Sequence, residues 1–266
     1  MCDTSGNSIL YLFKRRGTIQ QVTQWKKLNN ITDFSEIDDK LKNLFSVKEE
    51  KPAFKLNLPK EFISLANKGS SFPRASAKSY LSKRRVTKAD ILYWKIGYCP
   101  KGLYAERLII PSFDLKGNVN YFIARTYGGN WRKYLNPEVP KNEIIFNELY
   151  VDFKKPVTLV EGVFDAIVAG ENSIPILGST LRESTRLFQK IIENNSTVYM
   201  ALDPDATRKT NAIIEKLLRY GIKVCTIDVS GFKDVGEMTK EEFKTRKGNA
   251  TEVGDTLSLL LSNINF

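Results

Sequence analysis

The amino-acid sequence predicts an α/β fold, in which a parallel sheet with helices on both faces follows a basic mixed α+β subdomain. Beyond Pro156, apolar segments of strand length alternate with segments of helical periodicity, which is typical of βαβ units and a parallel sheet. Before Pro156, two apolar segments flank a turn that contains glycine, which is typical of an antiparallel hairpin. The net charge changes from positive to slightly negative at the same place in the chain. Residues 1–155 carry 28 Lys and Arg against 15 Asp and Glu, whereas residues 156–266 carry 13 against 15.

The front half of the chain is expected to begin with short helices and to continue as the basic subdomain. Thr87 is a suitable N-cap for the second of its two predicted helices, because Asp90 follows at the third helical position. Gly97 is expected to end that helix. The hairpin turn is expected at residues 114–118. The predicted elements are helices at 76–80 and 87–93 and strands at 108–111 and 119–125.

The back half of the chain has the pattern of alternating strands and helices. Gly170 and Gly221 follow two of the helices, at the position where a left-handed residue commonly ends a helix. The predicted strands are 157–160, 174–177, 198–202 and 223–229, and the predicted helices are 164–169, 181–193 and 208–220. We divide the chain into a short helical segment (1–50), the basic subdomain (51–155), the parallel-sheet domain (156–248) and a short C-terminal packing segment (249–266).

Two acidic motifs follow strands of the predicted parallel sheet. Glu161 and Asp165 come after the first strand, and Asp203 and Asp205 come after the third. Since the carboxyl ends of parallel strands meet at one edge, we expect these carboxylates to lie together. Carboxylates repel one another unless a cation lies between them, and hard oxygen ligands suit Mg²⁺ or Mn²⁺. Taken singly, each motif is also compatible with an ordinary surface turn.

Composition excludes several classes of function. The chain has no histidine, and its three cysteines (Cys2, Cys99 and Cys225) have no CxxC spacing, so we expect no zinc in this chain and no His-dependent catalysis. Sparse, odd cysteines indicate a reducing cytoplasm. No apolar run is long enough to span a membrane. The basic front half suits a polyanion that lies beside the carboxylates of the back half.

The two acidic motifs, taken in this order, resemble the Toprim fold shared by bacterial-type primases, type IA and type II topoisomerases and certain nucleases. Glu161 matches the glutamate of that family, and Asp203 with Asp205 matches its D-x-D. A third element, from Lys233 to Glu237, resembles the K-D-P-D-E of primases. Gly236 takes the place of the second aspartate of that element, which leaves the number of metals open.

The upstream segment resembles the basic subdomain of bacterial and phage primases. The resemblance covers residues 76–237. The matching elements are Tyr80-Leu81-x-x-Arg84, Ile96-Gly97-Tyr98, R-x-x-x-P at Arg107–Pro111, D-x-x-G at Asp114–Gly117, the arginine of G-R at Arg125, K-Y-x-N at Lys133–Asn136 and the Phe146-Asn147 pair.

The resemblance implies a DNA primase, an enzyme that synthesises short RNA primers from NTPs on single-stranded DNA for replication. The catalytic residues would be Glu161, Asp165, Asp203, Asp205 and Asp234; all but Asp165 would hold Mg²⁺ or Mn²⁺, and Asp165 would orient them. The residues expected to bind template or NTP are Arg107, Arg125, Lys133, Tyr134, Asn136 and Lys233. Either Trp131 or Tyr134 could stack on a base.

Two alternatives remain open at this point. A small Toprim nuclease would use the same carboxylates for hydrolysis, and a catalytically reduced DNA-binding subunit is compatible with Gly236. Residues 2–6 resemble the end of a zinc ribbon, but one cysteine cannot hold zinc. The expected partners are single-stranded DNA, NTPs, the RNA primer and a replicative helicase. The expected location is the cytoplasm of a bacterial cell, or of the host cell if a phage encodes the chain.

Overall fold

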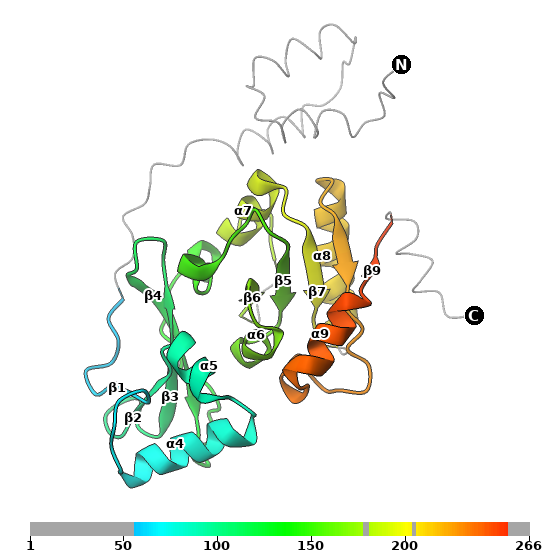
Figure 1. Cartoon of the computed structure of the whole chain (residues 1–266). Coiled ribbons are helices and arrows are strands. Elements are labelled where there is room, and N and C mark those ends of the chain that lie inside the picture. The colour runs from blue at the N-terminus through cyan, green and yellow to red at the C-terminus, as the bar shows by residue number, and fades with distance from the viewer. Residues whose placement is uncertain (1–55, 178–180, 204–205, 255–266) are drawn as a thin grey trace, which may run out of the picture.

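The computed structural model of the protein describes residues 56–177, 181–203 and 206–254 (Figure 1). These residues form two sheets, one built before residue 127 and the other after residue 156. The helices expected within residues 1–50, Asp205 and the end of the C-terminal packing segment lie outside the described residues. Within the described ranges, no helix combines the length and the apolar character needed to cross a bilayer.

The first sheet is antiparallel, with the strand order β1-β2-β3-β4. Two helices, α4 and α5, separate β1 from β2 along the chain. The bounds are Ile63–Ser64 for β1, Phe72–Lys83 for α4, Lys88–Tyr93 for α5, Gly97–Cys99 for β2, Arg107–Phe113 for β3 and Val119–Thr126 for β4.

The hairpin of β3 and β4 is the predicted one, extended at both ends. Its turn is closed by Asp114, whose Oδ1 accepts hydrogen bonds from the backbone N–H groups of Lys116 at 2.9 Å and Asn118 at 2.8 Å. Gly117 has φ of +80° in this turn, a conformation that glycine adopts without a steric penalty. The local sequence thus sets the hairpin register.

The predicted capping box of α5 is present, but Gly97 does not end the helix. Thr87 Oγ1 accepts from the N–H of Asp90 at 3.2 Å, and Asp90 Oδ2 accepts from the N–H of Thr87 at 2.8 Å. The left-handed residue after the helix is Lys95, with φ of +51°. Gly97 instead lies in β2, where a Cβ would meet the Phe62 ring and come within 2.6 Å of the Ile63 carbonyl oxygen. Close approach of β1 to β2 therefore requires glycine.

The second sheet is parallel except for its last strand, with the order β6-β5-β7-β8-β9. The strands are β5 (Val157–Val160), β6 (Ser173–Pro175), β7 (Val198–Ala201), β8 (Val224–Thr226) and β9 (Thr251–Glu252). The helices are α6 (Val163–Ala169), α7 (Arg186–Asn194), α8 (Thr207–Arg219) and α9 (Lys240–Gly248). Single turns of 3₁₀ helix are η1 (Lys141–Glu143), η2 (Glu148–Tyr150) and η4 (Val235–Glu237).

Helices cover both faces of this sheet, as predicted (Figure 1). Leu159 and Met200 point to the face where α7 and α8 pack, whereas Val160 and Ala201 point to the face where α6 and α9 pack. Every residue of the central strand β5 is buried, and so are most residues of β7, which explains their apolar sequences.

Some element bounds differ from the sequence prediction. Helix α7 begins five residues later than the predicted start at Leu181, because Thr185 is its N-cap and accepts from the N–H of Phe188 at 3.3 Å. Leu181 is nevertheless buried in the core beside it. Strands β1 and β9 have two residues each, too few to produce an alternating pattern.

One apolar cluster joins the two sheets. Leu108 and Ile110 of β3 and Tyr121 of β4 belong to the same buried cluster as Val163 and Phe164 of α6. The two halves therefore share a continuous interior, and Phe164 in the first turn of α6 contacts Tyr80 of α4, with 6.3 Å between the ring centroids.

We expect Gly97→Ala to lower the free energy of unfolding by about 1–3 kcal/mol, because the added methyl group collides with backbone that cannot move aside cheaply. Urea unfolding followed by circular dichroism measures the change. Gly129→Ala is the matched control, since a Cβ there has no neighbour within 4 Å. Equal unfolding free energies for the two variants would contradict the close approach of β1 and β2.

Candidate functional site

The predicted carboxylates lie at one edge of the parallel sheet. Glu161 follows β5 and Asp203 lies two residues beyond β7, and these strands are parallel neighbours with Val160 opposite Ala201. Glu161 is thus at the same edge as Asp203, as the strand order predicts. Asp205 lies outside the described residues.

Asp165 is buried in the first turn of α6 and bridges two loops. Its Oδ2 accepts a hydrogen bond from the N–H of Gly162 at 2.7 Å, and its Oδ1 accepts one from the N–H of Gly236 at 2.8 Å. Burial raises the pKa of Asp165 to about 6; the N–H donors of Gly162 and Gly236 oppose this, while the charges of Asp234 and Glu161 add to it. The loop after β5 and the loop before α9 are therefore held to each other by one carboxylate.

Gly236 is the residue that departs from the primase motif, and the structure explains why it is small. A Cβ at this position would lie 3.0 Å from Asp165 Oδ1 and 3.1 Å from Asp234 Oδ1. An aspartate at position 236 would bring its carboxylate close to those of Asp165 and Asp234, and the negative charges would repel one another. The hydrogen bond from the Gly236 N–H thus places the Asp165 carboxylate where a side chain at position 236 would lie.

The donor atoms at this edge suit a hard divalent cation. Asp234 Oδ1 is buried and accepts no hydrogen bond from the described part of the chain, and such an oxygen is costly unless a cation or a donor reaches it. Glu161 Oε1 lies 3.5 Å from Nζ of Lys209 in α8, a neighbour that the sequence did not indicate. Among the residues described, no three His, Cys, Asp or Glu side chains gather closely enough to form a metal cluster.

The cysteines lie apart from this edge. Cys99 and Cys225 are buried in β2 and β8, which belong to different sheets, and Cys2 lies outside the described residues.

Arg107 is buried and engaged with main chain. Its side chain is 4% exposed, and its guanidinium donates to the carbonyl oxygens of Arg132 at 2.9 Å and Lys133 at 3.4 Å. Burial lowers the pKa of Arg107, and the positive charges of Arg132 and Arg125 lower it further. Arg107 thus fixes the loop that carries Lys133, whose own side chain is exposed.

Arg125 belongs to an alternating stack of arginine and aromatic side chains. The Tyr80 hydroxyl accepts hydrogen bonds from Nε of Arg84 at 3.0 Å and from Nε of Arg125 at 2.9 Å. Arg125 lies 4.7 Å above the Tyr134 ring, and Arg84 lies 4.6 Å above the Phe164 ring. We call these five residues the arginine–aromatic stack. It runs from β4 to the start of α6, next to Asp165.

Tyr134 connects the basic surface with the acidic edge. It forms a β-bridge with Arg125, and its ring is 43% exposed. Burial of its hydroxyl raises the pKa of Tyr134; Arg125 and Arg84 lower that pKa, and Tyr80 and Asp165 raise it. Through Arg125, Tyr80 and Arg84, Tyr134 is linked to Phe164, the residue that precedes Asp165.

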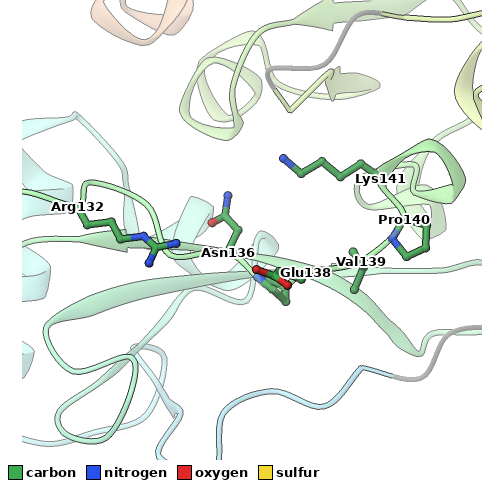
Figure 2. A pocket seen from close by; sticks show the side chains of 7 residues that line it. Arg132, Asn136, Glu138, Val139, Pro140 and Lys141 are labelled. Carbon is green, nitrogen blue, oxygen red and sulfur yellow. The ribbon is translucent and has the colours of Figure 1, made fainter.

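Asn136 and Lys233 have different surroundings. Asn136 Oδ1 accepts from the N–H of Ala124 at 3.0 Å, and Asn136 lines a pocket of about 520 Å³. Figure 2 shows Asn136 and Lys141 extending toward the same open space. The backbone N–H of Lys233 donates to Glu237 Oε2 at 3.0 Å, and the Lys233 side chain is exposed.

Two further charged contacts tie α4 and α5 to the loop of Asp234. Arg85, which has φ of +57°, donates to the carbonyl oxygen of Glu237 at 2.9 Å. Lys240 at the start of α9 pairs with the largely buried Asp90. Sequence reasoning missed both contacts, because their partners are about 150 residues apart in the chain.

No protein-family model matches the chain. It is 26% identical over 215 residues to a DNA primase of Thermotoga maritima, covering 62% of this chain and 37% of that protein. It is 30% identical over 153 residues to a DNA primase of Synechococcus elongatus, covering 50% of this chain and 22% of that protein. The chain thus spans well under half the length of these curated relatives.

Solved structures give the fold directly. A DnaG primase catalytic domain bound to ssDNA matches with a TM-score of 0.61 and 18% identity, over 85% of this chain and 83% of that one. The E. coli primase catalytic core matches with a TM-score of 0.59 and 19% identity, over 72% and 77%. The site and the sheets define an α/β protein with an acidic sheet edge beside a basic antiparallel sheet. Its fold is that of the bacterial-type DNA primase catalytic core, which confirms the resemblance seen in the sequence.

We expect Gly236→Asp to lower the free energy of unfolding by about 1–3 kcal/mol in a buffer without divalent cations, because the new side chain crowds Asp165 and Asp234. Urea unfolding measures the loss. Gly129→Asp adds the same side chain where nothing lies within 4 Å and serves as the control. Equal stability of Gly236→Asp and Gly129→Asp would show that steric crowding is not the reason for a glycine at position 236.

Proposed function

We propose that this chain is the catalytic core of a DNA primase, which synthesises short RNA primers from NTPs on a single-stranded DNA template. The observation that carries the proposal is the arginine–aromatic stack, which joins Tyr134 and Arg125 on the basic side to Phe164, the residue next to Asp165 at the carboxylate edge. The similarity to DNA primases, and to a primase domain bound to ssDNA, supports it.

The acidic edge would carry the chemistry. Glu161, Asp203, Asp205 and Asp234 would hold Mg²⁺ or Mn²⁺, which would neutralise triphosphate charge while a 3′-hydroxyl attacks the α-phosphorus and pyrophosphate leaves. Asp165 is a positioning residue, because both of its oxygens already accept main-chain hydrogen bonds. It keeps Glu161 and Asp234 on loops of fixed spacing. Glu161 is partly exposed and can hold or pass on a proton.

The basic surface would carry template and triphosphate. Lys133 presents an exposed ammonium group, Arg125 and Tyr134 present a paired cation and ring, and Asn136 lines the adjoining pocket. Lys233 is exposed beside Asp234. Arg107 acts by holding the Lys133 loop in place. We propose a replicative helicase as partner and the cytoplasm of a bacterial cell, or of a phage-infected host, as the location.

A catalytically reduced DNA-binding subunit is the second candidate, and Gly236 in place of an acidic residue favours it. A small Toprim nuclease would use the same carboxylates for hydrolysis. Incubation with a single-stranded template, labelled NTPs and Mn²⁺ separates the three functions. RNA oligomers support the primase, DNA fragments support the nuclease, and binding without product supports the reduced subunit.

Asp203→Ala is expected to lower primer synthesis about 100-fold or more, because a metal-binding carboxylate contributes several kcal/mol to the transition state. Binding of single-stranded DNA, measured by fluorescence anisotropy, is expected to stay within about twofold, since the basic surface is unchanged. Asp228→Ala, an exposed acidic position in the same domain, is the control. Normal synthesis by Asp203→Ala would refute the metal assignment.

Tyr80→Phe is expected to raise the KM for NTPs or the Kd for template about tenfold, because two guanidinium groups lose the oxygen that orients them. The ring remains, so the unfolding midpoint should change little. Tyr150→Phe removes a hydroxyl from a partly exposed tyrosine outside the arginine–aromatic stack and is the control. Unchanged KM and Kd in Tyr80→Phe would show that the stack has no part in binding.

A further inference from the structure

Trp131 is the most exposed of the large apolar side chains in the described part of the chain, with 90% of its surface accessible. Tryptophan is usually buried over most of its area, because its ring system is large and apolar. Trp94, by contrast, is 4% exposed. The folded structure does not use the Trp131 ring for packing, so another reason is needed for an indole at this position.

The backbone around Trp131 is held firmly although its side chain is not. On the C-terminal side, the buried Arg107 donates to the carbonyl oxygens of Arg132 and Lys133, and the N–H of Thr126 donates to Lys133 at 3.1 Å. On the N-terminal side, Thr126 Oγ1 donates to the carbonyl oxygen of Gly128 at 3.1 Å. The loop between β4 and Tyr134 is therefore anchored on both sides of Trp131, so a ligand has to order the side chain of Trp131 but not the loop.

The charges next to the indole select a polyanionic ligand. Arg132 and Lys133 follow it directly and are both exposed, and Arg132 lines the pocket that Lys141 and Asn136 also line. An exposed aromatic ring flanked by cations is the arrangement with which proteins bind single-stranded nucleic acid, since the ring stacks on a base while the cations meet phosphates.

We propose that Trp131 is a stacking platform for one unpaired base of the template strand, and that Arg132 and Lys133 bind the phosphates beside that base. The proposal rests on the proposed function only in taking single-stranded DNA as the ligand. Stacking is tolerant of base identity, because every base has a flat face. The platform would hold the strand beside the arginine–aromatic stack without reading its sequence.

The test is a double-mutant cycle on the full chain, with an oligo-dT and the same oligo carrying abasic sites. Trp131→Ala is expected to weaken binding of the intact oligo about tenfold and binding of the abasic oligo hardly at all. Trp131→Tyr should restore most of the affinity. Phe72→Ala, at a side chain that is 85% exposed on α4, is the control and should change neither Kd.

The salt dependence of Kd is a second measurement, which distinguishes base stacking from the attraction between cations and phosphates. Lys133→Ala should reduce the slope of log Kd against log salt, whereas Trp131→Ala should leave that slope unchanged. An equal loss on intact and abasic oligos, or no loss on either, would overturn the proposal. The binding cycle requires no polymerisation. Base stacking on Trp131 can therefore be detected in a protein that makes no primer, and it can be absent from a protein that does, so the two proposals can fail independently.

Discussion

The buried carboxylate of Asp165 is the constraint on which the acidic edge depends. It accepts one hydrogen bond from the loop after β5 and one from the loop before α9, so the protein itself determines how far apart Glu161 and Asp234 lie. Both donor residues are glycines, and a Cβ on either would come within 3.1 Å of a carboxylate oxygen of Asp165. Burial and the neighbouring acids disfavour the charged form, and the two N–H groups offset part of that cost. The spacing of the acidic loops is thus a property of the fold.

The same turn of helix also positions the basic surface. Phe164, which directly precedes Asp165, lies under the guanidinium of Arg84, and Tyr80 links Arg84 to Arg125. Of these two consecutive residues, Phe164 therefore contacts the guanidinium of Arg84, whereas Asp165 binds the two acidic loops. The two guanidinium groups share the Tyr80 hydroxyl as acceptor, and each also lies over an aromatic ring, which lowers the cost of placing two arginines close together.

Patterns within about ten residues predicted most of the fold, and contacts over longer distances account for what they missed. The βαβ alternation, the Asp114 turn and the Thr87 capping box are local, and the structure contains them. The common edge of Glu161 and Asp203 followed from strand order alone. An arginine on a strand can face solvent or the interior, so the sequence could not show that Arg107 is buried against a loop. The Tyr80 hydroxyl joins Arg125 across 45 residues, which no local pattern encodes.

The apolar cluster shared by the two sheets has a consequence for how this protein can be divided. Residues of β3, β4 and α6 belong to one buried cluster, which also includes Phe243 of α9. Cutting the chain between the sheets would expose apolar residues of this shared cluster to water on both fragments. The boundary near residue 155 divides the chain between the two sheets, but it does not divide the buried cluster that they share. We expect the two halves to be exchanged between genes as one module, since they share a buried apolar cluster.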